Sequence, residues 1–108
     1  MKFDLTLLHS MSGGDENFVK EMVQVFVRQY EEAERAMKSA CSEGDWMEVG
    51  RLAHKLKASI DTMSIGSLKQ LIRDIEMGGK EGKDLGPQCG RLFGEMDVVI
   101  MEMKALLS

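Results

Sequence analysis

The chain has 108 residues, the size of one small domain with a single hydrophobic core. Hydrophobic residues make up 44% of it and charged residues 30%, a composition that excludes a disordered chain. The net charge of −4 argues against a general nucleic-acid binder, because such proteins carry a surplus of basic residues that neutralise phosphates. We therefore expect one domain covering residues 1–108.

The two cysteines, Cys41 and Cys89, do not form a CxxC pair. This pattern excludes a disulfide scaffold and indicates reduced thiols, as in the cytosol. No signal-peptide pattern opens the sequence, and no apolar run approaches the roughly 18 residues that a membrane span needs. The sequence thus predicts a cytoplasmic, soluble domain without a membrane partner. It assigns no role to Cys41, Cys89 or His9.

The first predicted element, residues 4–11, forms one or two helical turns that cap the rest of the fold. Its inward-facing side chains are Leu5, Leu8 and Met11. A long amphipathic helix follows, from the N-cap residue Asp15 to near Gly44. Its apolar positions recur at spacings of three and four. They are Val19, Met22, Val23, Phe26, Tyr30, Ala33, Met37 and Ala40.

The next helix begins at Asp45, which forms a capping-box pattern with Glu48. Its inward-facing stripe is Val49, Leu52, Ala53, Leu56, Ile60 and Met63. After a short break at residues 62–66, another helix runs to Gly78-Gly79. Its inward-facing residues are Leu68, Leu71, Ile72 and Ile75. A break this short forces the two helices into an antiparallel hairpin.

The last helix begins near Pro87, because proline suits the first turn, where its missing N–H would be unpaired anyway. It is predicted to bury Leu92, Phe93, Met96, Val99, Ile100, Met103 and Leu107. Four amphipathic helices with short connections predict an all-α fold, an antiparallel four-helix bundle with a short N-terminal capping helix. The opposite face of the last helix carries a second strip of apolar and small residues. The strip consists of Gly90, Gly94, Val98, Met101 and Ala105. The N-terminal turn or a second subunit could cover it, although we expect a monomer.

His54 lies roughly 140° around its helix from the centre of the apolar stripe, so its ring is expected to point toward solvent. One turn before and after it stand the small residues Gly50 and Ala58, which leave the ring accessible to a large partner. Met47 adds an exposed apolar contact on the same face. Lys57, three residues after the histidine, is within reach of a group attached to the ring.

The partner of His54 is predicted from the hairpin. If the chain turns about Ile65, then His54 and Glu76 lie level, because each is eleven positions from it. The Glu76 carboxylate can then accept a hydrogen bond from one ring nitrogen and raise the basicity of the other. The alternative is a surface ion pair between Arg73 and Glu76. The sequence leaves both interpretations open.

The basic side chains around His54 favour the binding of a negatively charged group there. Residues 51–73 carry five basic side chains and one acidic side chain, Asp61. The basic ones are Arg51, Lys55, Lys57, Lys69 and Arg73. A phosphoryl group on the ring would be screened by Lys57. No metal site is expected, because no second histidine or cysteine lies three or four positions away and adjacent lysines repel cations.

The run Ala53-His54-Lys55-Leu56-Lys57-Ala58-Ser59, followed by Leu68 and a helix reaching Glu76, resembles the histidine-containing phosphotransfer (Hpt) domains of bacterial multistep two-component signalling. The resemblance covers roughly residues 13–107. It implies that His54 is the phosphoacceptor, that Lys57 steadies the phosphoryl group, and that Glu76 hydrogen-bonds the histidine. Ala58 stands where many members have glycine and is still small enough for docking.

The resemblance implies a phosphocarrier rather than an enzyme. His54 would accept a phosphoryl group from an aspartyl-phosphate receiver domain and pass it to another receiver domain. The implied partners are response-regulator receiver domains and a hybrid histidine kinase. The expected docking residues are Met47, Gly50, Arg51, Lys55, Ala58 and Asp61. No cofactor is expected, since Mg²⁺ belongs to the receiver.

Two alternatives stay open. The chain could be a non-catalytic helical adaptor or an oligomerisation module with an incidental surface histidine. ATP binding and self-phosphorylation are not expected, because the sequence has neither a GxGxxG motif nor a P-loop.

Overall fold

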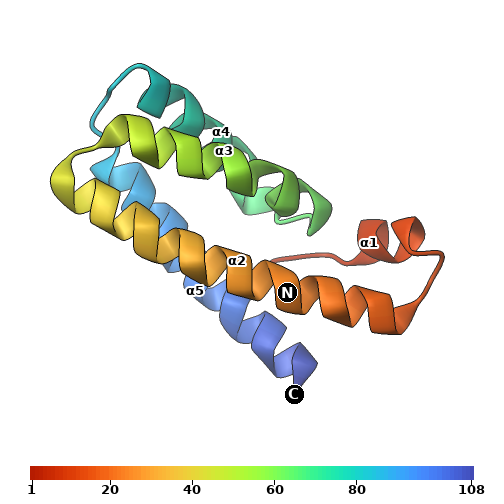
Figure 1. Ribbon diagram of the computed structural model, residues 1–108. Helices are drawn as coiled ribbons and strands as arrows, with labels where there is room; N and C mark the ends of the chain where they lie inside the picture. Colours follow the sequence, from red (N-terminus) through yellow and green to blue (C-terminus); the bar gives the residue numbers. More distant parts are fainter.

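The computed structural model describes residues 1–108 and consists of five α-helices without a strand (Figure 1). The helices are α1 Thr6–Met11, α2 Glu16–Glu43, α3 Trp46–Thr62, α4 Gly66–Lys80 and α5 Gly86–Leu107. The predicted all-α class is therefore confirmed. None of the helices combines the length and the apolar character that crossing a bilayer requires.

Local sequence signals set the starts of α2 and α3 as predicted. The side chain of Asp15 caps α2 by accepting a hydrogen bond from the Phe18 amide, and Asp45 caps α3 through the Glu48 amide. The capping box predicted at Asp45 forms only in part. The Glu48 carboxylate turns instead to the Arg51 guanidinium, which makes two hydrogen bonds to it.

Successive helices run in opposite directions along the molecule (Figure 1). The most extensive contact is between α3 and α4, which form a hairpin, while α2 packs against both α3 and α5. One cluster of buried apolar residues draws on all five helices. The molecule is elongated, measuring 42 × 22 × 18 Å. Exposed residues run along both helices of the hairpin, among them His54 and Lys80, so one long flank of α3 and α4 is not covered by other helices.

The N-terminal segment differs in part from the prediction. Leu8 is buried as expected, but Met11 is exposed and Leu5 is only half-buried. The segment is anchored instead through Phe3, which the sequence analysis did not place in the core. The Asp4 amide donates to the carbonyl of Met63, the C-cap residue of α3, at 3.0 Å, so this bond joins the segment to the end of α3.

The core of α5 is predicted well except at its edges. Phe93 and Leu107 are half-buried rather than buried, and Cys89 is buried although it received no role. Val98 and Met101, on the second apolar strip of this helix, are exposed. The N-terminal turn does not cover them.

The predicted exposure of Gly50 is wrong. This residue is buried against α4, whereas the sequence analysis placed it on the exposed face beside His54. A Cβ atom built on Gly50 would lie 3.0 Å from the Cα of Gly79, and one built on Gly79 would lie 2.6 Å from the Cα of Gly50. The two glycines therefore let the backbones of α3 and α4 touch. The prediction failed because a residue without a side chain gives no sign of which helix covers it.

Candidate functional site

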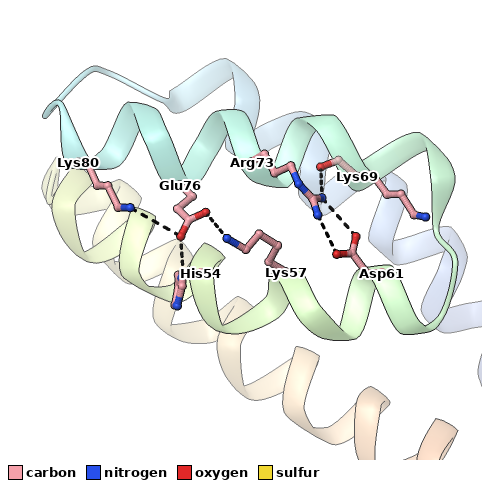
Figure 2. A network of polar contacts seen from close by, with 7 residues as sticks. All are labelled: His54, Lys57, Asp61, Lys69, Arg73, Glu76 and Lys80. Carbon is pink, nitrogen blue, oxygen red and sulfur yellow. Dashed lines mark hydrogen bonds and ion pairs between the residues drawn. The ribbon is translucent and has the colours of Figure 1, made fainter.

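His54 stands on the uncovered flank of α3 with 64% of its side chain exposed, as predicted. Its Nδ1–H donates a hydrogen bond to Oε2 of Glu76, which comes from α4 (Figure 2). The two residues thus meet at the register expected from the hairpin. The alternative pairing of Arg73 with Glu76 is wrong, because the Arg73 guanidinium binds Asp61.

Glu76 is the only charged residue in the buried set, with 10% of its side chain exposed. Its Oε1 accepts a hydrogen bond from Lys57 Nζ at 2.8 Å, and Lys80 Nζ lies 4.0 Å from its Oε2. The hydrogen bonds from Lys57 and then His54 lower the pKa of Glu76 from its ordinary value of 4.5 to about 2, against the opposing effect of burial. The carboxylate is therefore ionised at neutral pH.

The charge of Glu76 determines which nitrogen of the His54 ring carries the proton. An ionised carboxylate only accepts hydrogen bonds, so Nδ1 of His54 carries the ring proton. The lone pair of the neutral ring then lies on Nε2. Because the ring projects from α3 into solvent, Nε2 is available as a nucleophile (Figure 2).

A second ion pair joins the same two helices further along the hairpin. Arg73 of α4 donates to both carboxylate oxygens of Asp61 on α3, at 2.7 and 3.2 Å, and also to the Lys69 carbonyl at 2.9 Å (Figure 2). The Arg73 hydrogen bonds lower the pKa of Asp61. Asp61, predicted as a docking residue, thus already has a partner within the chain and is half-buried.

The other predicted docking residues on α3 are accessible. Met47, Lys55 and Ala58 are exposed. Arg51 is exposed as well, although its guanidinium pairs with Glu48. These residues lie on the same helix as His54. Gly50, the remaining predicted docking residue of this helix, is buried.

A hollow between α2 and α3 adds residues that the sequence analysis missed. It has a volume of about 390 Å³. Its lining consists of Gln29, Glu32, Ala33, Ala36, Leu52, Lys55 and Leu56. A smaller hollow of about 130 Å³ shares Gln29 and continues along α3 past Ala58 to Met63. The two hollows form an α2–α3 groove that two predicted docking residues, Lys55 and Ala58, also line.

Comparison with known proteins agrees with this geometry. The family model described as the Hpt domain matches residues 21–107, which include all of α3 and α4. The chain belongs to the Hpt domain family. Neither a search of curated proteins nor a search of solved structures gave a match. Membership in the Hpt family implies histidine phosphotransfer in phosphorelays.

Because the Glu76 carboxylate is ionised in the folded state, the stability of this Hpt domain is expected to depend on pH. A carboxylate whose pKa is lowered by folding stabilises the native state above its unfolded pKa and loses this effect as pH falls through its folded pKa. We expect the free energy of unfolding to fall more steeply between pH 4.5 and pH 2 in the wild type than in Glu76→Gln. Denaturant titrations at several pH values measure both slopes.

The control for this comparison is Glu21→Gln, which removes an exposed carboxylate of α2. It should keep the wild-type slope. Equal slopes for Glu76→Gln and the wild type would show that the contacts of Glu76 do not stabilise the fold.

Proposed function

We propose that this Hpt domain is a phosphocarrier that accepts a phosphoryl group on Nε2 of His54 from the aspartyl phosphate of a receiver domain. It then passes the group to the aspartate of a second receiver. The proposal rests chiefly on one observation, an exposed imidazole whose inner nitrogen is held by a buried, ionised carboxylate. In this proposal a hybrid histidine kinase supplies the phosphate to the first receiver, and α2 to α5 form the antiparallel four-helix bundle predicted from the sequence.

The transfer step needs no acid or base from the solvent. The lone pair on Nε2 attacks phosphorus in line, so that a P–N bond forms while the P–O bond to the aspartate breaks. The electron pair of that bond returns to the aspartate carboxylate. The ring keeps its proton on Nδ1 and becomes positively charged, and Glu76 stabilises this charge as it develops. Mg²⁺, carried by the receiver, would balance the charge of the phosphoryl oxygens.

We assign to Lys57 the role of hydrogen-bonding the phosphoryl oxygens during transfer. Its ammonium group has three N–H donors, of which Glu76 occupies one, and 31% of the side chain is exposed. We expect Lys57→Ala to slow phosphotransfer about tenfold, because a charge-assisted hydrogen bond to the transferring group is lost. Rapid-quench kinetics with a phosphorylated receiver measure the rate.

Lys69→Ala is the matched control for Lys57→Ala, because it removes an exposed lysine from α4 without touching Glu76. Transfer at the wild-type rate in Lys57→Ala would show that Lys57 takes no part in the transfer step. An equal loss of rate in both variants would show that it acts only through general surface charge.

We assign receiver docking to the exposed residues of α3 and the α2–α3 groove beside them. Lys55 and Ala58 support this assignment, because they line the groove and lie on the same helix as His54. The basic residues Arg51 and Lys55 complement the negative charge of a phosphoaspartate site. The apolar floor of the groove would take an apolar side chain of the receiver.

A substitution on α2 tests docking separately from chemistry. Ala36→Arg places a long side chain in the α2–α3 groove, whereas Ser39→Arg places the same side chain on the exposed surface of α2 outside it. We expect Ala36→Arg to weaken receiver binding about tenfold and Ser39→Arg to leave it near the wild-type value. Fluorescence titration with a receiver measures both dissociation constants. Equal affinities would place docking elsewhere.

Incubation with a phosphorylated receiver distinguishes the carrier from a helical adaptor. A carrier acquires a phosphate that is labile in acid and stable in base, as expected for phosphohistidine. An adaptor binds the receiver and acquires none.

A further inference from the structure

The lifetime of a phosphohistidine depends on the nitrogen that does not carry the phosphoryl group. With the phosphoryl group on Nε2, the P–N bond breaks readily when Nδ1 is protonated, because the leaving group is then a neutral imidazole. In hydrolysis a water oxygen bonds to phosphorus, the P–Nε2 bond breaks, and its electron pair returns to Nε2. The water proton passes to solvent, so the products are inorganic phosphate and a neutral ring that still carries a proton on Nδ1.

In this Hpt domain Nδ1 of His54 is hydrogen-bonded to an ionised carboxylate. Glu76 receives the Nδ1–H on Oε2, while Lys57 occupies Oε1. With both oxygens bonded and the side chain buried, the carboxylate is fixed in position against the ring. An ionised acceptor favours a protonated ring much more than a neutral acceptor does.

The other charged groups around His54 do not cancel this effect. On α3, Arg51 is paired with Glu48 and Asp61 with Arg73. Lys55 is exposed to solvent, which screens its charge. Lys57 and Lys80 oppose a positive ring, but both ammonium groups lie on the carboxylate rather than on the imidazole. Glu76 is thus the one charged group bonded to the ring.

From this geometry we propose that Glu76 keeps phosphorylated His54 protonated at Nδ1, which shortens the lifetime of the phosphohistidine and raises its tendency to transfer. The inference rests on the proposed phosphocarrier function. It makes Glu76 a positioning residue that also determines how long the signal persists.

The test compares the wild type with Glu76→Gln, whose amide can still accept the Nδ1–H but carries no charge. Both proteins are phosphorylated with phosphoramidate, a small phosphodonor, and the donor is removed. The loss of phosphate is then followed by ³¹P NMR from about pH 6 to about pH 10. The rate of hydrolysis should fall with rising pH in both proteins, with its midpoint about one pH unit lower in Glu76→Gln.

At mildly alkaline pH the phosphohistidine of Glu76→Gln should therefore last on the order of fivefold longer than that of the wild type. Glu21→Gln is the control and should follow the wild-type profile. Superimposable profiles, or a shorter lifetime in Glu76→Gln, would overturn the inference and leave the phosphocarrier function standing. If neither phosphoramidate nor a phosphorylated receiver phosphorylates His54, both proposals fail.

A measurement on the wild type alone covers the case in which Glu76→Gln does not fold. The ¹⁵N chemical shift of Nδ1 in phosphorylated His54 reports directly whether this nitrogen is protonated. We expect most of it to be protonated at the pH where free phosphohistidine has lost half of this proton. A deprotonated Nδ1 at this pH would overturn the inference.

Discussion

His54→Gln is expected to carry no phosphate after incubation with a phosphorylated receiver, under conditions in which the wild type becomes labelled. Glutamine has no nucleophilic nitrogen, so no P–N bond can form. The fold should remain intact, because the histidine ring is mostly exposed and contributes little to the core. Transfer of labelled phosphate, followed by gel or mass spectrometry, gives the result.

His9→Gln is the natural control, since His9 in α1 is the only other histidine of the chain. It should be labelled like the wild type. Circular dichroism and thermal unfolding of both variants establish that the helices are retained. Labelling of His54→Gln at the wild-type level would mean that another residue receives the phosphate.

Gly79→Ala is expected to cause the largest loss of stability among single-methyl additions to this chain. The new Cβ would lie 2.6 Å from both the Gly50 Cα and the Trp46 carbonyl oxygen. These are backbone atoms that cannot rotate aside, so α4 has to move away from α3. Overpacking of this kind costs about 1–3 kcal/mol. Chemical denaturation measures the change in the free energy of unfolding.

Gly94→Ala is the matched control for Gly79→Ala. Gly94 lies on the exposed face of α5, where a Cβ would meet nothing within 4 Å. Alanine forms helix better than glycine by about 1 kcal/mol, so this variant should be as stable as the wild type or more so. A similar stability for the two variants would show that α3 and α4 can separate at little cost.

The features that the sequence predicts well are local. The N-caps at Asp15 and Asp45 depend on a side chain and the amide three residues later, so the sequence specifies them completely. The contact of His54 with Glu76 is less local, but the short turn around Ile65 fixes the register of the hairpin. A helical wheel and a residue count therefore suffice to place the main features of the site.

The features that the sequence does not predict depend on contacts between distant helices. Burial of Gly50 depends on the backbone of α4, and the part that Ala36 takes in the α2–α3 groove depends on α2 lying beside α3. Neither glycine nor alanine shows in the hydropathy pattern which neighbour it meets. Lys80 is different, because its position one turn after Glu76 was a signal that could have been used.

Locating the phosphoryl group after transfer from a receiver decides whether this Hpt domain works through His54. Peptide mass spectrometry at alkaline pH identifies the phosphorylated residue, and ³¹P–¹⁵N couplings in labelled protein identify the nitrogen. We expect one phosphoryl group per chain, on Nε2 of His54. Phosphate on Nδ1, on another residue, or on no residue of the chain would contradict this assignment.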